Sequence, residues 1–133
     1  MESRITPFLM FTGQAEEAMN LYASVFPDAE IEQIQRYGEG EDGAEGTVMR
    51  AVFRLQNQRF VCIDSPPVHA FGFTPSISMF VECPSAEEVD RICARLSDGG
   101  SVMMPLGEYP FSNRFAWISD HFGVSWQLSL ALD

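Results

Sequence analysis

Histidine and cysteine, which most readily act as general base or nucleophile near neutral pH, are few in this sequence. The two histidines are His69, in a proline-rich stretch, and His121, in the turn sequence Asp-His-Phe-Gly. We interpret both as solvated or hydrogen-bonded side chains, because both fall outside the predicted strands. No serine lies in a Gly-x-Ser-x-Gly motif, so the serine hydrolase arrangement is not predicted.

The three cysteines, Cys62, Cys83 and Cys93, show neither an even count nor a Cys-x-x-Cys spacing. This pattern argues against a disulfide framework and against a zinc knuckle, and it favours free thiols that fill small apolar spaces. Cys62 is the best candidate nucleophile, but its sequence neighbours Val61 and Ile63 offer no base. We therefore expect it to be a buried, unreactive thiol.

The charged side chains restrict the possible partners. Nineteen acidic residues against eight basic ones give a net charge of −11, which repels phosphate backbones and anionic lipid. No apolar run is long enough to cross a bilayer, and the first residues do not resemble a secretory signal, so we predict a cytoplasmic protein. Arg50, Arg54 and Arg114 lie on predicted strands, where they either bind an anionic ligand or pair with the many acids. The second interpretation is favoured.

An internal repeat organises the elements that must position any site. Ala15-Glu16-Glu17 recurs as Ala86-Glu87-Glu88, and each copy follows a short apolar run, residues 6–11 and 77–82. Helical spacing of apolar residues predicts helices over Gln14–Phe26 and Ala86–Ser97. Ser85 and Glu88 have the capping-box spacing, which predicts that the second helix begins there.

Three strand-like segments follow each predicted helix. They are residues 31–37, 47–56, 58–64, 101–106, 114–119 and 124–130. The order strand, helix, three strands occurs twice and predicts an α+β fold of two βαβββ modules with a mixed eight-stranded arrangement. We expect one domain, with modules over 1–66 and 76–133 and a connector over 67–75. Phe71 and Phe73 in the connector either pack on the opposite half or cover a ligand pocket.

Both ends of the sequence resemble a known family. Ile5–Phe11, Gly13–Met19 with Tyr22, and Asp120–Leu128 are similar to the PhnB-like branch of the vicinal oxygen chelate (glyoxalase/bleomycin resistance/dioxygenase) superfamily. This group is labelled 3-demethylubiquinone-9 3-methyltransferase-like. The resemblance implies a curved sheet that forms an open cup, with helices outside. The sequence does not support methyl transfer from S-adenosylmethionine, because it has no glycine-rich turn between a strand and a helix.

The resemblance also implies where a metal would be bound. The superfamily's metal positions fall on or near Pro7, Cys62, Ser78 and Gln127, with Asp64 and Ser76 as alternates in a shifted register. Proline has no ligating side chain and serine is a poor ligand, so we predict no metal and no cofactor. The expected function is metal-free binding of a small, partly apolar organic molecule. The alternative is a divalent-metal-dependent lyase, isomerase or dioxygenase with an atypical ligand set.

The expected ligand site is centred on Gln127. In residues 124–130 this glutamine shares a strand face with Ser125 and Ser129, whereas Trp126 and Leu128 share the apolar face. We expect the apolar face to pack on the helices and the polar face to line the cup. The candidate ligand-binding residues are Gln127, Ser78, Cys62, Phe71 and Phe73. We also expect a homodimer, because the fold leaves sheet edges uncovered and the resemblance points the same way.

Overall fold

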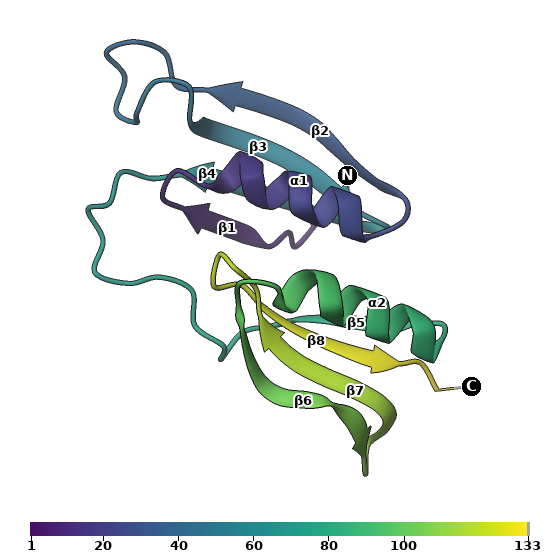
Figure 1. Ribbon diagram of the computed structural model, residues 1–133. Coiled ribbons are helices and arrows are strands. Elements are labelled where there is room, and N and C mark those ends of the chain that lie inside the picture. The colour runs from purple at the N-terminus through teal and green to yellow at the C-terminus, as the bar shows by residue number, and fades with distance from the viewer. Residues whose placement is uncertain (133) are drawn as a thin grey trace. The chain divides into compact units, whose positions relative to one another are not determined.

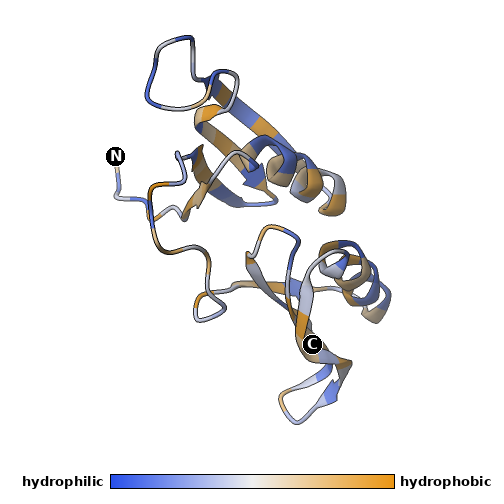
Figure 2. Ribbon diagram, turned by 60° about the vertical axis from the view of Figure 1, so that its left-hand side comes forward, coloured by the Kyte–Doolittle hydropathy of each residue, from blue (hydrophilic) through white to orange (hydrophobic). Residues whose placement is uncertain are grey.

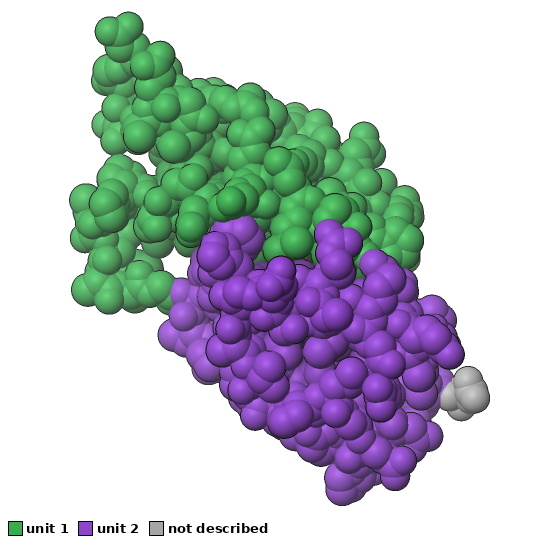
Figure 3. All heavy atoms as spheres, viewed as in Figure 1, with its two compact units in different colours: residues 1–72 green, residues 73–133 purple. Residues whose placement is uncertain are grey.

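The computed structural model describes residues 1–132 (Figure 1). The chain divides into two compact units, residues 1–72 and the residues from 73 onward (Figure 3). The boundary falls inside the segment 67–75 that was expected to connect the modules. Each unit contains one helix and one four-stranded sheet.

The first unit contains the elements expected of one βαβββ module. They are β1 (Phe8–Phe11), α1 (Ala15–Val25), β2 (Ala29–Arg36), β3 (Val48–Leu55) and β4 (Gln58–Asp64). The strand order in the sheet is β1-β4-β3-β2. β1 runs parallel to β4, and the other pairs are antiparallel. The first and last strands of the module are therefore neighbours at one side of the sheet.

The second unit repeats this arrangement. Its elements are β5 (Met79–Cys83), α2 (Ala86–Ser97), β6 (Ser101–Tyr109), β7 (Ser112–Ser119) and β8 (Ser125–Leu130). The strand order is β5-β8-β7-β6, with β5 parallel to β8 and the other pairs antiparallel. The predicted α+β fold of two βαβββ modules is confirmed. The strands form two separate four-stranded sheets.

Helix α1 begins at a side chain that is distant in the sequence. Gln14 occupies the N-cap position without a side-chain cap. Oδ1 of Asp64, the last residue of β4, instead accepts hydrogen bonds from the amides of Gly13 (2.8 Å) and Ala15 (2.9 Å). Its Oδ2 accepts one from the amide of Val48 (2.9 Å). This buried carboxylate satisfies the amide of the first helical residue, Ala15, and that of Gly13 just before the helix, and it joins β4 to α1 and β3.

Helix α2 begins at its own cap and has the range that the sequence predicts, Ala86–Ser97. Oγ of Ser85 accepts a hydrogen bond from the amide of Glu88 at 3.2 Å. The carboxylate of Glu88 pairs with Arg91 at 2.8 Å, one helical turn further on. The N-terminal boundary of this helix was predictable because its cap is local in the sequence.

Each helix covers one face of the sheet in its own unit. Hydrophilic and hydrophobic residues alternate around both helices (Figure 2), as expected of helices with one buried side. In the first unit, Tyr22 of α1 contacts Phe53 of β3 with ring centroids 6.2 Å apart, and Phe53 stacks on Phe60 of β4 at 4.9 Å. In the second unit, Trp126 and Leu128 of β8 are almost fully buried.

Strands β2, β6 and β7 extend beyond their predicted ranges, β2 and β7 by two residues at the start and β6 by three residues at the end. The sequence predicts a strand over residues 101–106, but β6 continues through Gly107 to Tyr109, although glycine is unusual in strand interiors. The pairing of β6 with β7 shifts register on both sides of Gly107. Proline lacks an amide hydrogen, but β6 is an edge strand, so Pro105 breaks no pairing with a further strand. The register shifts around Gly107 let β6 continue to pair with β7. Strands β1 and β5 each begin two residues later than predicted.

None of the described helices combines the length and apolar character that crossing a membrane requires.

Candidate functional site

A row of three side chains crosses the middle of the second sheet on the side away from α2. Gln127 of β8 pairs with Phe80 of β5 on one side and with Trp117 of β7 on the other. Paired residues point to the same face of a sheet, and successive residues alternate. Their strand neighbours Trp126 and Leu128 are buried on the opposite face, so the row lies on the exposed one.

We call this surface, formed by Ser78, Phe80, Trp117, Ser125 and Gln127, the open face. It has an unusual composition for a sheet surface. The ring of Phe80 is 58% exposed, whereas Gln127 and Trp117 are partly buried. The two aromatic side chains offer flat apolar surface, and the amide between them offers hydrogen-bonding groups, each one strand away from its neighbour.

A chain of hydrogen bonds links the polar groups of the open face. Nε1 of Trp117 donates to Oγ of Ser125 at 2.9 Å. The hydroxyls of Ser125 and Ser78 are 2.6 Å apart. Nε2 of Gln127 donates to Oγ of Ser78 at 3.4 Å. Within residues 1–132, no hydrogen bond is found to Oε1 of Gln127.

An aromatic cluster borders the open face near the turn between β6 and β7. Phe115, which pairs with Ser129 and so shares the face of Gln127, is only 2% exposed. Tyr109 and Phe111 meet its ring edge-on at centroid distances of 5.6 and 4.8 Å. The Tyr109 hydroxyl donates to the carbonyl of Pro105 at 2.7 Å, which holds the cluster on the hairpin.

The structure brings together two of the expected ligand-binding residues, Gln127 and Ser78. Phe73 belongs to the same unit and lies at the turn before β8, because a Cβ added to Gly123 would be 3.7 Å from the Phe73 Cβ. Phe71 belongs to the first unit, is 68% exposed, and stacks on His69 at a centroid distance of 4.9 Å. The two connector phenylalanines therefore have different surroundings.

Cys62 lies on the covered face of the first sheet. It pairs with Leu9 of β1 and Ala51 of β3, and its exposure is 0%. Burial, with a smaller effect of the nearby Asp64 carboxylate, raises the pKa of this thiol to about 12. We therefore leave Cys62 out of the candidate site, since a ligand on an exposed surface cannot reach its sulfur.

Sequence reasoning did not select Phe80, Trp117 or Ser125 as candidate site residues. The signal that can find them is alternation, because residues two apart in a strand share a face. For Ser125 this signal was visible, since it shares a face with Gln127. To predict Phe80 and Trp117 as site residues, one must also know the register of β8 with β5 and β7. The sequence of a single strand does not contain this information.

The residues present at the superfamily's metal positions do not fit a divalent metal. Pro7 has no side-chain donor and its carbonyl accepts from the amide of Val61 at 3.0 Å. Cys62 is turned into the core, and the oxygens of the alternate position Asp64 accept from three backbone amides. No group of three or more His, Cys, Asp or Glu in residues 1–132 is arranged to hold a metal ion.

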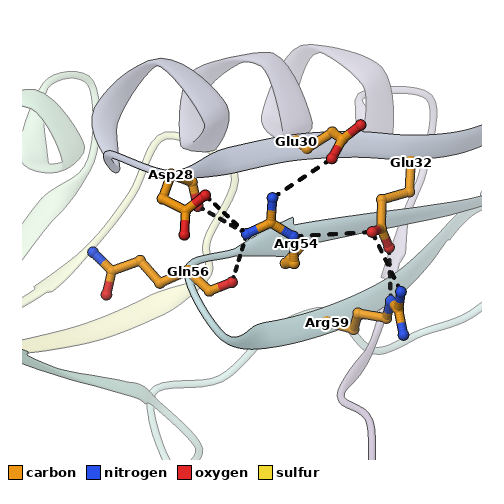
Figure 4. A network of polar contacts seen from close by, with 6 residues as sticks. All are labelled: Asp28, Glu30, Glu32, Arg54, Gln56 and Arg59. Carbon is orange, nitrogen blue, oxygen red and sulfur yellow. Dashed lines mark hydrogen bonds and ion pairs between the residues drawn. The ribbon is translucent and has the colours of Figure 1, made fainter.

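Of the three strand arginines considered in the sequence, Arg54 and Arg114 pair with acids, as favoured there. Arg50 is exposed, and no ion pair of its side chain is found within residues 1–132. Arg54 lies 3.2 Å from Asp28, 3.5 Å from Glu30 and 3.9 Å from Glu32, and Arg59 binds Glu32 at 2.7 Å (Figure 4). The hydrogen bond from Arg59 holds the pKa of the Glu32 carboxyl below its usual value. Because Arg54 is already paired with three acids, its guanidinium is not free to bind an anionic ligand.

A second arginine is paired in the same way. Nε of Arg114, on β7, lies 2.7 Å from Oδ1 of Asp90 on α2, and its Nη2 lies 3.1 Å from Oδ2. This two-pronged pair ties the helix to the sheet. The hydrogen bond to Asp90 also raises the pKa of Arg114 further above its ordinary value.

Two βαβββ modules, each with parallel first and last strands, define the fold class of the vicinal oxygen chelate proteins. The fosfomycin resistance protein FosX of Listeria monocytogenes has this fold, with a TM-score of 0.66 over 100% of this chain and 94% of that one. Its sequence is 13% identical, so the likeness concerns the fold alone.

Residues 3–129 match the model of the family described as 3-demethylubiquinone-9 3-methyltransferase, and the chain belongs to this PhnB-like family. A Bacillus cereus PhnB protein, described as a putative 3-demethylubiquinone-9 3-methyltransferase, is 53% identical, with a TM-score of 0.94 over 97% of this chain and 100% of that one. A Pseudomonas aeruginosa protein is 26% identical, with a TM-score of 0.86 over 99% and 100%. No curated protein matches the chain.

Proposed function

We propose that this protein binds a small, partly apolar organic molecule on the open face, without a metal ion. The observation that carries the proposal is the row Phe80, Gln127 and Trp117. A ring of Phe80 that is 58% exposed lies beside a half-buried amide whose oxygen has no partner in residues 1–132. A ligand with an apolar body and a polar end would cover the ring and complete the hydrogen bonding of the amide.

The surroundings of the row support binding of a ligand rather than packing of the row's own side chains. Trp117 is fixed by its bond to Ser125, so its ring offers a rigid wall. Phe115 at the end of the face is already covered by Tyr109 and Phe111, whereas Phe80 is not. A rigid, preorganised surface loses little conformational freedom when a ligand binds. In this proposal Phe73, near the turn before β8, forms part of the cover.

Methyl transfer is not part of the proposal. Nucleotide-type cofactors usually place their phosphates at a helix N-terminus reached by a glycine-rich loop. In this chain the amides at the start of α1 already bond the Asp64 carboxylate, and the start of α2 is capped by Ser85. Both helix N-termini therefore have internal partners.

The two tryptophans provide a test with an internal control. Trp117 lies on the open face, whereas Trp126 lies on the covered face with its Nε1 bonded to Asp120 at 2.9 Å. We expect small aromatic amides and alcohols, screened by ¹H–¹⁵N correlation spectra, to shift the indole signal of Trp117 and leave that of Trp126 in place. A screen in which both signals move together, or neither moves, would count against the open face as the site.

We also propose that the protein forms a homodimer. Each unit leaves two edge strands, β1 and β2 in the first and β5 and β6 in the second. Apolar residues on two of these edge strands remain exposed, Phe8 of β1 at 55% and Val102 of β6 at 55%. Exposed edges with apolar side chains are surfaces that a second copy of a chain commonly covers.

A further inference from the structure

The hydrogen bonds of the open face have a direction that its geometry decides. Oγ of Ser125 accepts from Nε1 of Trp117 and shares one proton with Oγ of Ser78. Ser125 is 2% exposed, and no other acceptor lies within hydrogen-bonding distance of its hydroxyl in the described part of the chain. Because a buried hydroxyl proton without an acceptor costs free energy, Ser125 donates to Ser78.

This direction leaves the Ser78 hydroxyl with an unused proton. Its oxygen accepts from Ser125 and from Nε2 of Gln127, which occupies both lone pairs. Its own hydrogen has no acceptor among residues 1–132. Next to it, Oε1 of Gln127 has no donor. The partly buried pair therefore presents the Ser78 hydroxyl as a donor directly beside Oε1 of Gln127 as an acceptor, with the second Nε2 hydrogen of Gln127 as a further donor.

The result does not depend on which way the Gln127 amide is turned. With oxygen and nitrogen exchanged, Ser78 donates to Gln127, the amide nitrogen is left free to donate, and the second lone pair of Ser78 is left to accept. In both orientations a donor and an acceptor lie side by side for a ligand, in opposite order. A ligand that carries both groups on adjacent atoms can satisfy either arrangement by turning over.

Charge excludes one large class of such ligands. Glu82 pairs with Ser129 and so lies on the same face as Gln127, where its side chain is exposed. The whole chain has a net charge of −11. A carboxylate would meet this field without a free cationic partner on the second sheet, because Arg114, the one arginine of its strands, is paired with Asp90.

Resting on the proposed function, we infer that the open face recognises an uncharged amide or lactam attached to an aromatic ring. The amide carbonyl and its N–H bind the donor and acceptor of Ser78 and Gln127. The attached ring lies in the row between the side chains of Phe80 and Trp117, which are one strand to either side of Gln127. Two hydrogen bonds on adjacent atoms fix the orientation of such a planar group.

The experiment compares 2-quinolone, a planar lactam, with N-methyl-2-quinolone and quinoline, titrated into the full chain and followed by the Trp117 indole signal. N-methylation removes only the donor, and quinoline keeps an acceptor and the rings. We expect 2-quinolone to bind about three- to tenfold more tightly than either control, the ratio that one lost hydrogen bond produces.

Variants of the serines separate the inference from the proposed function. In Ser78→Ala the affinity for 2-quinolone should fall at least about threefold, because one hydrogen bond to the amide is lost in either orientation of Gln127. In Ser76→Ala the affinity should stay unchanged, because Ser76 is exposed and its side chain bonds only to Thr74 among the described residues. If all three probes shift Trp117 with equal affinity, the open face binds aromatic molecules but the inference about the amide is wrong. If none of them shifts Trp117, the inference is wrong and the proposed function loses support as well.

Discussion

Nε2 of Gln127 and Oγ of Ser78, 49 positions apart in the sequence, meet at 3.4 Å on the open face of the second sheet. Gln127 lies in the last strand of its module and Ser78 lies directly before the first. They meet because β5 and β8 pair in parallel as neighbours. The same topology places the first and last strands of the first module side by side, but there Phe8 pairs with the apolar Val61 as Phe80 pairs with Gln127 in the second module. The two modules share a fold and differ in what they expose.

The variant Gln127→Leu should separate binding from stability. Gln127 is partly exposed and its one hydrogen bond is long, so we expect the free energy of unfolding to change by no more than about 1 kcal/mol. Affinity for 2-quinolone should fall at least about threefold, because one hydrogen bond is lost. Urea unfolding and the indole titration measure the two quantities. Gln33→Leu, on the exposed part of β2, is the control. Equal binding by Gln127→Leu and the parent would remove Gln127 from the site.

The variant Asp64→Asn should destabilise the first unit strongly. The Asp64 carboxylate accepts from the amides of Gly13, Ala15 and Val48, and an asparagine amide would turn a donor toward at least one of them. We expect a loss of roughly 2–4 kcal/mol in the free energy of unfolding. Asp42→Asn, in the exposed loop between β2 and β3, should be nearly neutral in the same urea titration. A small effect of Asp64→Asn would show that α1 does not depend on this cap.

The cysteine thiols should resist alkylation while the protein is folded. Burial raises the pKa of Cys62 to about 12 and that of Cys83 to about 11, and it raises the pKa of Cys93. A thiol with a raised pKa stays protonated below that pKa, so at pH 8 the reactive thiolate is scarce. Mass spectrometry after iodoacetamide should show no adduct on the native chain and three on the chain unfolded in urea. Rapid labelling of Cys62 in the native protein would contradict its buried position.

Stoichiometric binding of a transition metal is not expected. Of the four superfamily positions, Pro7 offers no side-chain donor and Cys62 is turned away from solvent, which leaves the neutral groups of Ser78 and Gln127. Elemental analysis of freshly purified, dialysed protein is therefore expected to give well under one equivalent of zinc, iron or manganese per chain. Near one equivalent of any of them, together with turnover that depends on it, would favour the metal-dependent enzyme instead.

The proposed homodimer predicts a mass of twice the chain's 14.9 kDa in light scattering at micromolar concentration. Phe8→Glu and Val102→Glu place a charge on one exposed apolar position in each unit, and at least one of them should shift the mass toward that of the monomer. Thr74→Glu, at an exposed position outside the strands, serves as the matched control. A monomer mass for the parent protein would overturn the proposal.

The module order and most element boundaries, to within two residues, could be predicted from short-range patterns in the sequence. Helical spacing and the Ser85 cap place α2 at Ala86–Ser97, and alternation along residues 124–130 assigns Gln127 and Trp126 to opposite faces. The resemblance of the two ends to PhnB-like proteins was confirmed by the family match.

Which residues meet could not be predicted from the sequence, because it depends on how the strands pair. The face of the sheet on which Cys62 lies depends on the register of β4 with β1. A shift of one residue in a strand moves every side chain to the other face. The sequence determines the register only to within a residue or two, so the face of Cys62 could not be predicted. The Asp64 cap of α1 and the chain from Trp117 through Ser125 and Ser78 to Gln127 join residues from separate strands. Such contacts exist only after the strands have paired, because no local pattern in the chain contains both partners.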